Sequence, residues 1–125
     1  QVFTSGYRVR VRCGKYREPD VFFVTKSRKL EERFAHGADL AIEIVSEGQE
    51  HRDRDLVEKR KDYAAGRVSE YWIVDPEMET ITVLTLKRNA YRLHGEFRPG
   101  QTATSLLLPD FQVDVAPCFK AARKN

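Results

Sequence analysis

Two short apolar runs, separated by a charged segment of helical length, constrain the fold of this chain more than any other feature. The runs are DLAIEIVS at residues 39–46 and SEYWIVD at residues 69–75. Near-continuous Leu, Ile, Val and Ala over the length of one strand is typical of a strand buried on both faces. Residues 51–65 are charged and free of Gly and Pro, which predicts a helix terminated near Gly66. This order predicts a right-handed βαβ crossover.

Further strands are expected on both sides of this unit, so the pattern indicates an α/β (α+β) fold. Alternating apolar residues and turn signals predict the remaining elements. They are strands at residues 7–13 and 20–25, a short helical turn at Leu30–Phe34, a hairpin of residues 80–87 and 90–95 around Arg88-Asn89, a short strand at 111–115 and a short helix at 117–123.

Composition and cysteine usage exclude several classes of protein. The chain has 125 residues, 41% of them apolar and 33% charged, which indicates one globular domain rather than a disordered chain. No stretch approaches the ~18 uninterrupted apolar residues of a membrane helix. Cys13 and Cys118 are far apart, so free thiols in a cytoplasmic protein are expected, with a single disulfide as the alternative. The scattered histidines argue against zinc.

Glu43 contradicts its surroundings more than any other residue, because it lies within the apolar run AIEIV. A carboxylate in a buried strand is costly unless a cation neutralises it or it becomes protonated. Asp20, before the apolar run VFFV, is the second candidate, although aspartate after proline is also a common turn residue. Mg²⁺ is often held by only one or two carboxylates. Asp39 lies four residues before Glu43 on the same face of that strand.

Lys59 occupies the face of the predicted helix that should pack on the sheet, since Leu56, Lys59 and Tyr63 have helical spacing. Its ammonium could reach a phosphoryl oxygen or an attacking water beside the carboxylates. The alternative is a lysine that extends to solvent and pairs with Asp55 or Asp62 on the same helix. Because Lys59 follows the buried Glu43 within the predicted βαβ unit, the functional interpretation of Lys59 is favoured.

Three arginines near the N-terminus alternate with apolar residues. On a strand, Arg8, Arg10 and Arg12 share one face. A row of guanidinium groups suits the phosphate backbone of a nucleic acid. The solvated outer face of an edge strand is an equally weighted alternative.

The motifs considered so far, taken together, resemble the Uma-type family of restriction-endonuclease-like proteins, also called domain of unknown function 820. They are PDVFFV, DLAIEIVS, Asp55-x₃-Lys59-x₃-Tyr63 and SEYWIVDP, with looser similarity through ITVLTL and LLLPDFQVDV. The resemblance implies the PD-(D/E)XK nuclease superfamily and its restriction-endonuclease-like central mixed β-sheet flanked by helices, here with a C-terminal β-hairpin. By the same resemblance, Asp20 and Glu43 are the acidic residues of the motif.

The chain departs from the superfamily pattern at one position. The lysine that usually stands two residues after the second acid is replaced by Val45, and the resemblance implies that Lys59 on the following helix takes its place. We expect residues 1–125 to form a single nuclease-like domain with part of the N-terminal layer shortened or absent. An acidic ligand that the superfamily often places on its first helix has no candidate in this sequence.

These residues predict metal-dependent hydrolysis of a phosphodiester, with DNA favoured over RNA. Asp20, Glu43 and the Ile44 carbonyl would hold one Mg²⁺ or Mn²⁺, and Lys59 would orient the nucleophile. Asp39 and Asp55 would support these groups. Three alternatives stay open at this point: a catalytically inactive module that binds nucleic acid, a module that binds protein, and a structural ion pair of Lys59 with Asp20 or Glu43. A homodimer is one option for the oligomeric state.

Overall fold

The computed structural model describes residues 1–4, 6–46 and 52–123. A six-stranded mixed sheet forms its centre, in the order β1-β4-β6-β7-β8-β9. The strands are β1 (Val2–Thr4), β4 (Val21–Phe23), β6 (Leu40–Ile44), β7 (Glu70–Asp75), β8 (Thr80–Lys87) and β9 (Ala90–Phe97). β6 and β7 are parallel, and every other neighbouring pair in the sheet is antiparallel. The predicted central mixed sheet and the predicted β8–β9 hairpin are confirmed.

The helix α1 (Arg52–Ala65) lies between β6 and β7 in the chain, as the strand–helix–strand pattern predicted. Its predicted first residue, His51, lies outside the described residues. The helix ends as expected before Gly66, but the left-handed residue is Arg67, with φ 60°. The amide of Arg67 donates a hydrogen bond to the Ala64 carbonyl, and the amide of Val68 donates one to the Tyr63 carbonyl, which closes the last turn.

Gly66 serves a different purpose from the terminator role that the sequence suggested. A Cβ on Gly66 would lie 2.9 Å from both the Cα and the carbonyl oxygen of Val11. The missing side chain therefore lets the end of α1 approach the backbone of β2 (Arg8–Arg12) closely.

A second, three-stranded sheet has the order β3-β2-β5, with β3 (Lys15–Arg17) and β5 (Phe34–Ala35) on either side of β2. β2 is therefore a central strand, and its description as an edge strand is wrong. The helical turn predicted at Leu30–Phe34 is also wrong. The chain bends at residues 32–33 instead, so that Leu30 bridges Ala35, and Arg8 donates its amide to the carbonyl of Arg33. Tertiary pairing overrides the weak local preference.

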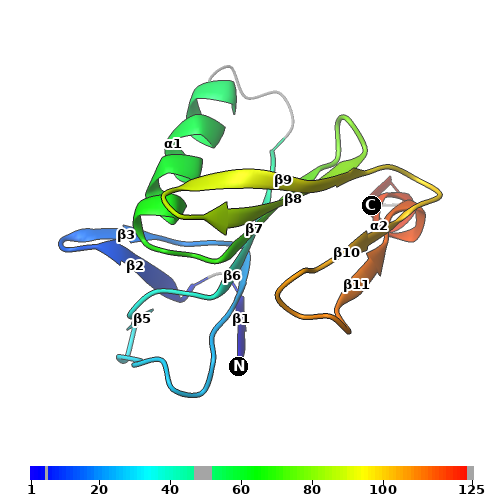
Figure 1. Ribbon diagram of the computed structural model, residues 1–125. Helices are drawn as coiled ribbons and strands as arrows, with labels where there is room; N and C mark the ends of the chain where they lie inside the picture. Colours follow the sequence, from blue (N-terminus) through cyan, green and yellow to red (C-terminus); the bar gives the residue numbers. More distant parts are fainter. Residues whose placement is uncertain (5, 47–51, 124–125) are drawn as a thin grey trace.

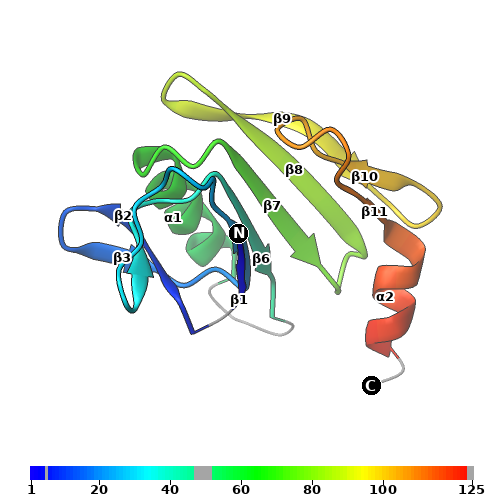
Figure 2. The same ribbon diagram turned by 90° about the horizontal axis from the view of Figure 1, so that it is seen from below.

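Different elements cover the two faces of the central sheet (Figures 1 and 2), and an apolar core lies against each face. One core joins the sheet to α1 and β2 and includes Val11, Phe22, Tyr63 and Tyr71. The other lies beneath β10 (Thr102–Thr104), β11 (Gln112–Asp114) and α2 (Val115–Arg123). Neither helix of the described part is long and apolar enough to cross a membrane.

Candidate active site

Asp20 and Glu43 lie side by side at one end of the central sheet. β4 and β6 pair with Val21 opposite Ile42, so the next pair along the ladder is Asp20 and Glu43. Partners in such a register point to the same face of a sheet. Ala41, two residues before Glu43, belongs to the core beneath α1, so Glu43 also faces that helix. The two acids predicted as a pair are therefore neighbours.

Glu43 is only 5% exposed and has few groups to compensate its charge. Its Oε2 accepts a hydrogen bond of 2.6 Å from the Tyr63 hydroxyl and lies 3.7 Å from the Lys59 ammonium. Burial raises the pKa of Glu43 above its ordinary value, and Asp20 raises it further, although Tyr63 and Lys59 oppose the shift. The ionised pair is therefore an unfavourable concentration of negative charge in this structure.

The backbone of β6 fixes the other carboxylate. Asp20 Oδ2 accepts a 2.7 Å hydrogen bond from the amide of Ile44. This bond ties the residue before β4 to the last residue of β6, next to Glu43. The Ile44 side chain is 51% exposed, so this end of the sheet is open to solvent.

Lys59 reaches the carboxylates from α1. Its Nζ lies 3.2 Å from Asp55 Oδ2, one turn earlier on the helix, as well as 3.7 Å from Glu43. The alternative partner, Asp62, is instead held by Lys15 and Arg17, at 3.1 and 2.6 Å. A small pocket of about 50 Å³ lies here, and its lining includes Glu43, Ile44, Val45, Asp55 and Lys59. Lys59 thus borders the same space as Val45, which stands two residues after Glu43.

Asp39 is not brought into this cluster. It directly precedes β6, at the end of the strand away from Glu43. Its Oδ1 pairs with Arg28 at 2.6 Å, and its Oδ2 accepts the amide of Thr25 at 2.8 Å. The alternation that put Asp39 on the same face as Glu43 carries no information about distance along the strand, so the structure gives Asp39 a separate role in holding the 25–28 segment.

The three arginines lie on a different sheet from the acids. Val9 and Val11 are buried, whereas Arg8, Arg10 and Arg12 occupy the outward face of β2. The guanidinium carbon of Arg8 lies 5.1 Å from the centre of the Tyr16 ring. The shared outward face that alternation predicted is therefore confirmed.

Tyr63 is the site residue to which sequence reasoning gave no role. It is fully buried, and burial together with the negative charge of Glu43 raises the pKa of its hydroxyl well above the ordinary value. The phenol therefore stays protonated and acts as a donor to Glu43. The signal was present in the helical spacing of Lys59 and Tyr63, but an aromatic residue on a core-facing stripe is usually packing alone.

A divalent cation fits this arrangement in charge and donor type. Mg²⁺ commonly takes one or two protein carboxylates and completes its shell with water and phosphate oxygens. Asp20 and Glu43 supply two oxygen-bearing groups whose mutual repulsion a cation would relieve. Among residues 1–4, 6–46 and 52–123, no group of three or more His, Cys, Asp or Glu could hold a metal ion. Asp20 and Glu43 are the two carboxylates that the β4–β6 ladder places side by side.

Comparison with known proteins agrees with this architecture. The family model Uma2, described as "Putative restriction endonuclease", matches residues 1–116. A crystal structure of a putative nuclease belonging to DUF820 from Anabaena variabilis is similar, with a TM-score of 0.69 and 17% sequence identity. The match covers 96% of this chain and 68% of the other. No curated protein matches the sequence. With most of its length matched by that family model, the chain belongs to the Uma2 family.

Proposed function

We propose that this protein hydrolyses phosphodiester bonds of nucleic acid with the help of a divalent metal ion, and that DNA is preferred over RNA. Membership of a family described as restriction endonucleases supports a nuclease-type role. The observation that carries the proposal is the buried Glu43 beside Asp20, because neither a structural core nor a simple binding surface benefits from two adjacent carboxylates.

Asp20, Glu43 and the backbone carbonyl of Ile44 are the groups proposed to hold one Mg²⁺ or Mn²⁺. Such an ion, when bound, supplies Lewis-acid chemistry that lowers the pKa of water and offsets charge growing on phosphoryl oxygens. Asp20 is kept in place by the Ile44 amide, and Glu43 by the Tyr63 hydroxyl. Because these contacts already hold the carboxylates, they need to rearrange little when the metal ion binds, which favours tight binding and a fixed ligand geometry.

Lys59 is proposed to orient the attacking water or to stabilise negative charge on the phosphoryl group. Its ammonium lies within ion-pair distance of both Asp55 and Glu43, and Lys59 lines the pocket beside them. Asp55 is proposed to be a positioning residue that acts through Lys59. Arg8, Arg10 and Arg12 are proposed to bind the phosphate backbone without regard to sequence.

A structural ion pair is the competing explanation, because Lys59 already lies within ion-pair distance of Glu43. The pair is long at 3.7 Å, and Lys59 is closer to Asp55. In this alternative the protein has no use for a metal and its unfolding temperature does not respond to one.

Thermal unfolding with and without Mn²⁺, together with plasmid cleavage, tests the proposal. A ligand that binds only the folded state raises the unfolding temperature. We expect Mn²⁺ to raise it in the wild type, and Glu43→Gln to abolish both this response and the cleavage. Unchanged Mn²⁺-dependent cleavage by Glu43→Gln would refute the assignment. Absence of any Mn²⁺ response in the wild type would favour the structural ion pair.

A further inference from the structure

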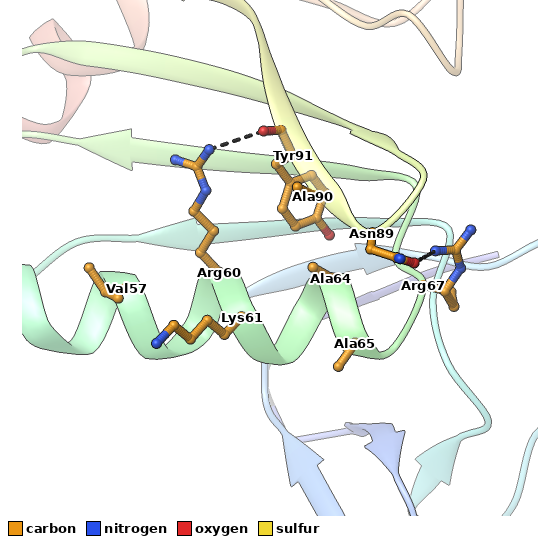
Figure 3. Close-up of a pocket in the computed structure, with 9 residues that line it drawn as sticks. All are labelled: Val57, Arg60, Lys61, Ala64, Ala65, Arg67, Asn89, Ala90 and Tyr91. Atoms are coloured by element: carbon orange, nitrogen blue, oxygen red, sulfur yellow. Dashed lines mark hydrogen bonds between the residues drawn. The ribbon is translucent and has the colours of Figure 1, made fainter.

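A groove of about 550 Å³ lies on the side of α1 turned away from the carboxylates. It runs between the helix and the turn that joins β8 to β9 (Figure 3). Val57, Arg60, Lys61 and Ala64 line it at helical spacing, whereas Asp55, Lys59 and Tyr63 face the other side of the same helix. The groove is therefore separate from the candidate active site.

The charged residues that line this groove are all basic. Its cations are Arg60, Lys61 and Arg67, and no carboxylate lines it. Arg60 donates to the carbonyl of Tyr91 at 3.2 Å, and Arg67 donates to the carbonyl of Arg88 and to Asn89 Oδ1. These acceptors are neutral, so they hold the guanidinium groups in place without cancelling their charge.

Two other basic residues of the same helix, Arg54 and Lys59, are paired with acids, unlike the groove cations. Arg54 lies 3.7 Å from Glu58, and Lys59 lies 3.2 Å from Asp55. Within the described part of the chain, none of the three groove cations forms an ion pair. A concave surface with three cations, two of them held by hydrogen bonds, and no acid in its lining attracts a polyanion. Guanidinium groups with free N–H donors suit phosphate oxygens.

The floor of the groove allows a chain to lie close to the helix. Ala64 and Ala90 contribute only methyl groups, and Val57 is 52% exposed. The apolar strip between charged walls suits the alternation of sugar and phosphate along a nucleic-acid backbone. An acidic peptide would meet the cations equally well, but the family of this chain makes nucleic acid the favoured ligand.

We propose that this groove is a second binding site for the phosphate backbone of nucleic acid, formed by Arg60, Lys61 and Arg67. The choice of ligand rests on the proposed function, but the site itself requires neither the metal nor Glu43. Bound there, a nucleic acid would contact the face of α1 opposite to the one that carries Lys59. The contact would be independent of sequence and sensitive to salt.

Fluorescence anisotropy with a labelled DNA duplex in EDTA tests the site without any metal chemistry. The variant combines Arg60→Gln, Lys61→Gln and Arg67→Gln. A matched control combines Lys29→Gln, Arg54→Gln and Arg98→Gln, which removes the same charge from exposed cations that are already paired with acids. Lys61→Glu is a second test that breaks no hydrogen bond of the described structure.

We expect the groove variant to bind the duplex about 10-fold or more weakly than the wild type. The slope of its log affinity against log salt concentration should fall by about two to three, as expected for the loss of about two to three phosphate contacts. The control should stay near wild type, and Lys61→Glu should weaken binding in the same direction. Equal losses in the groove variant and the control would overturn the proposal. Stronger binding of a polyglutamate peptide than of the duplex would also overturn it, since the groove would then favour acidic protein.

Cleavage measured separately with Mn²⁺ distinguishes failure of this site from failure of the proposed function. If DNA binding depends on the groove residues but the wild type shows no Mn²⁺-dependent cleavage, the groove is supported as a binding site and the proposed hydrolase function is refuted. Wild-type cleavage together with undiminished binding by the groove variant would refute the groove and leave the hydrolase standing.

Discussion

Two buried glutamates on neighbouring strands of the central sheet have opposite surroundings. Glu70, at the start of β7, is fully buried and accepts hydrogen bonds from the Trp72 indole, the Ser105 hydroxyl and the amides of Leu106 and Leu107. Glu43, on β6, receives one hydroxyl donor, from Tyr63. Glu70 fastens the 105–107 segment to the sheet, whereas Glu43 borders the small pocket that Lys59 also lines.

The difference shows that burial of a carboxylate does not by itself mark a functional site. Four donors satisfy both oxygens of Glu70, so no further ligand is needed there. Glu43 has a carboxylate neighbour and only a distant ammonium, so its charge is under-compensated. The unmet requirement for positive charge, rather than the burial, indicates the site.

Exchanging each glutamate for glutamine is the strongest test of this contrast. Glu70→Gln turns an amide toward donors and should lower the free energy of unfolding by about 2–4 kcal/mol. Glu43→Gln should change it by only about 1 kcal/mol, because it also removes repulsion from Asp20, but should abolish cleavage. Urea unfolding and plasmid cleavage measure the two effects. Equal destabilisation by both variants would remove the distinction.

The variant Lys59→Ala tests whether the Lys59 ammonium, near Glu43, takes part in the cleavage reaction. Loss of one positive group that stabilises a transition state typically costs about 10²–10³-fold in rate. We expect such a loss of cleavage, while the Mn²⁺-dependent rise in unfolding temperature persists. If the variant cleaved at the wild-type rate, Lys59 would have no part in the chemistry and would only form a surface ion pair with Asp55. Lys29→Ala, which removes an exposed lysine that pairs with Glu31, is the control for the chemical step.

Each of the two glutamates accepts a hydrogen bond from one hydroxyl group, and removing that hydroxyl is a milder comparison of the two sites than replacing the glutamate. Tyr63→Phe and Ser105→Ala should each lower the free energy of unfolding by about 1–2 kcal/mol, as expected for a hydrogen bond to a charged group. Only Tyr63→Phe should also weaken Mn²⁺ binding, because it frees the Glu43 carboxylate. Calorimetric titration with Mn²⁺ measures this. Loss of Mn²⁺ affinity in Ser105→Ala would contradict the separation of the two sites.

Asp62 provides the reference case of an acid neutralised by fixed cations, and the smallest expected effect. Burial tends to raise the pKa of Asp62, but Arg17 and Lys15 together hold it below its ordinary value. Stability from this contact is therefore present above the ordinary pKa of 3.8 and is lost as pH falls through the lower folded-state pKa. Asp62→Asn should cost about 1 kcal/mol at neutral pH and reduce this acid sensitivity in urea unfolding.

Sequence patterns predicted the elements whose signals are local and strong. The apolar runs around Glu43 and Trp72 became β6 and β7, and the charged segment before Gly66 became α1. The turn expected at Leu30–Phe34 failed because its backbone pairs with β2, which is distant in sequence. Similarly, Asp39 shared a face with Glu43 in the pattern, but Arg28 holds it at the other end of the strand.

The amino-acid sequence by itself determined the central strands, the connecting helix and the oddity of Glu43, because period and composition are encoded by near neighbours. Only the tertiary structure decided which acids meet. Pairing of β4 with β6 placed Asp20 beside Glu43, and the packing of α1 delivered Tyr63 and Lys59 to them. Three of the four donors that satisfy the Glu70 carboxylate come from residues 105–107, which lie more than thirty positions later in the sequence. Charge compensation depends on distances in space, and the spacing of residues along the chain does not specify those distances.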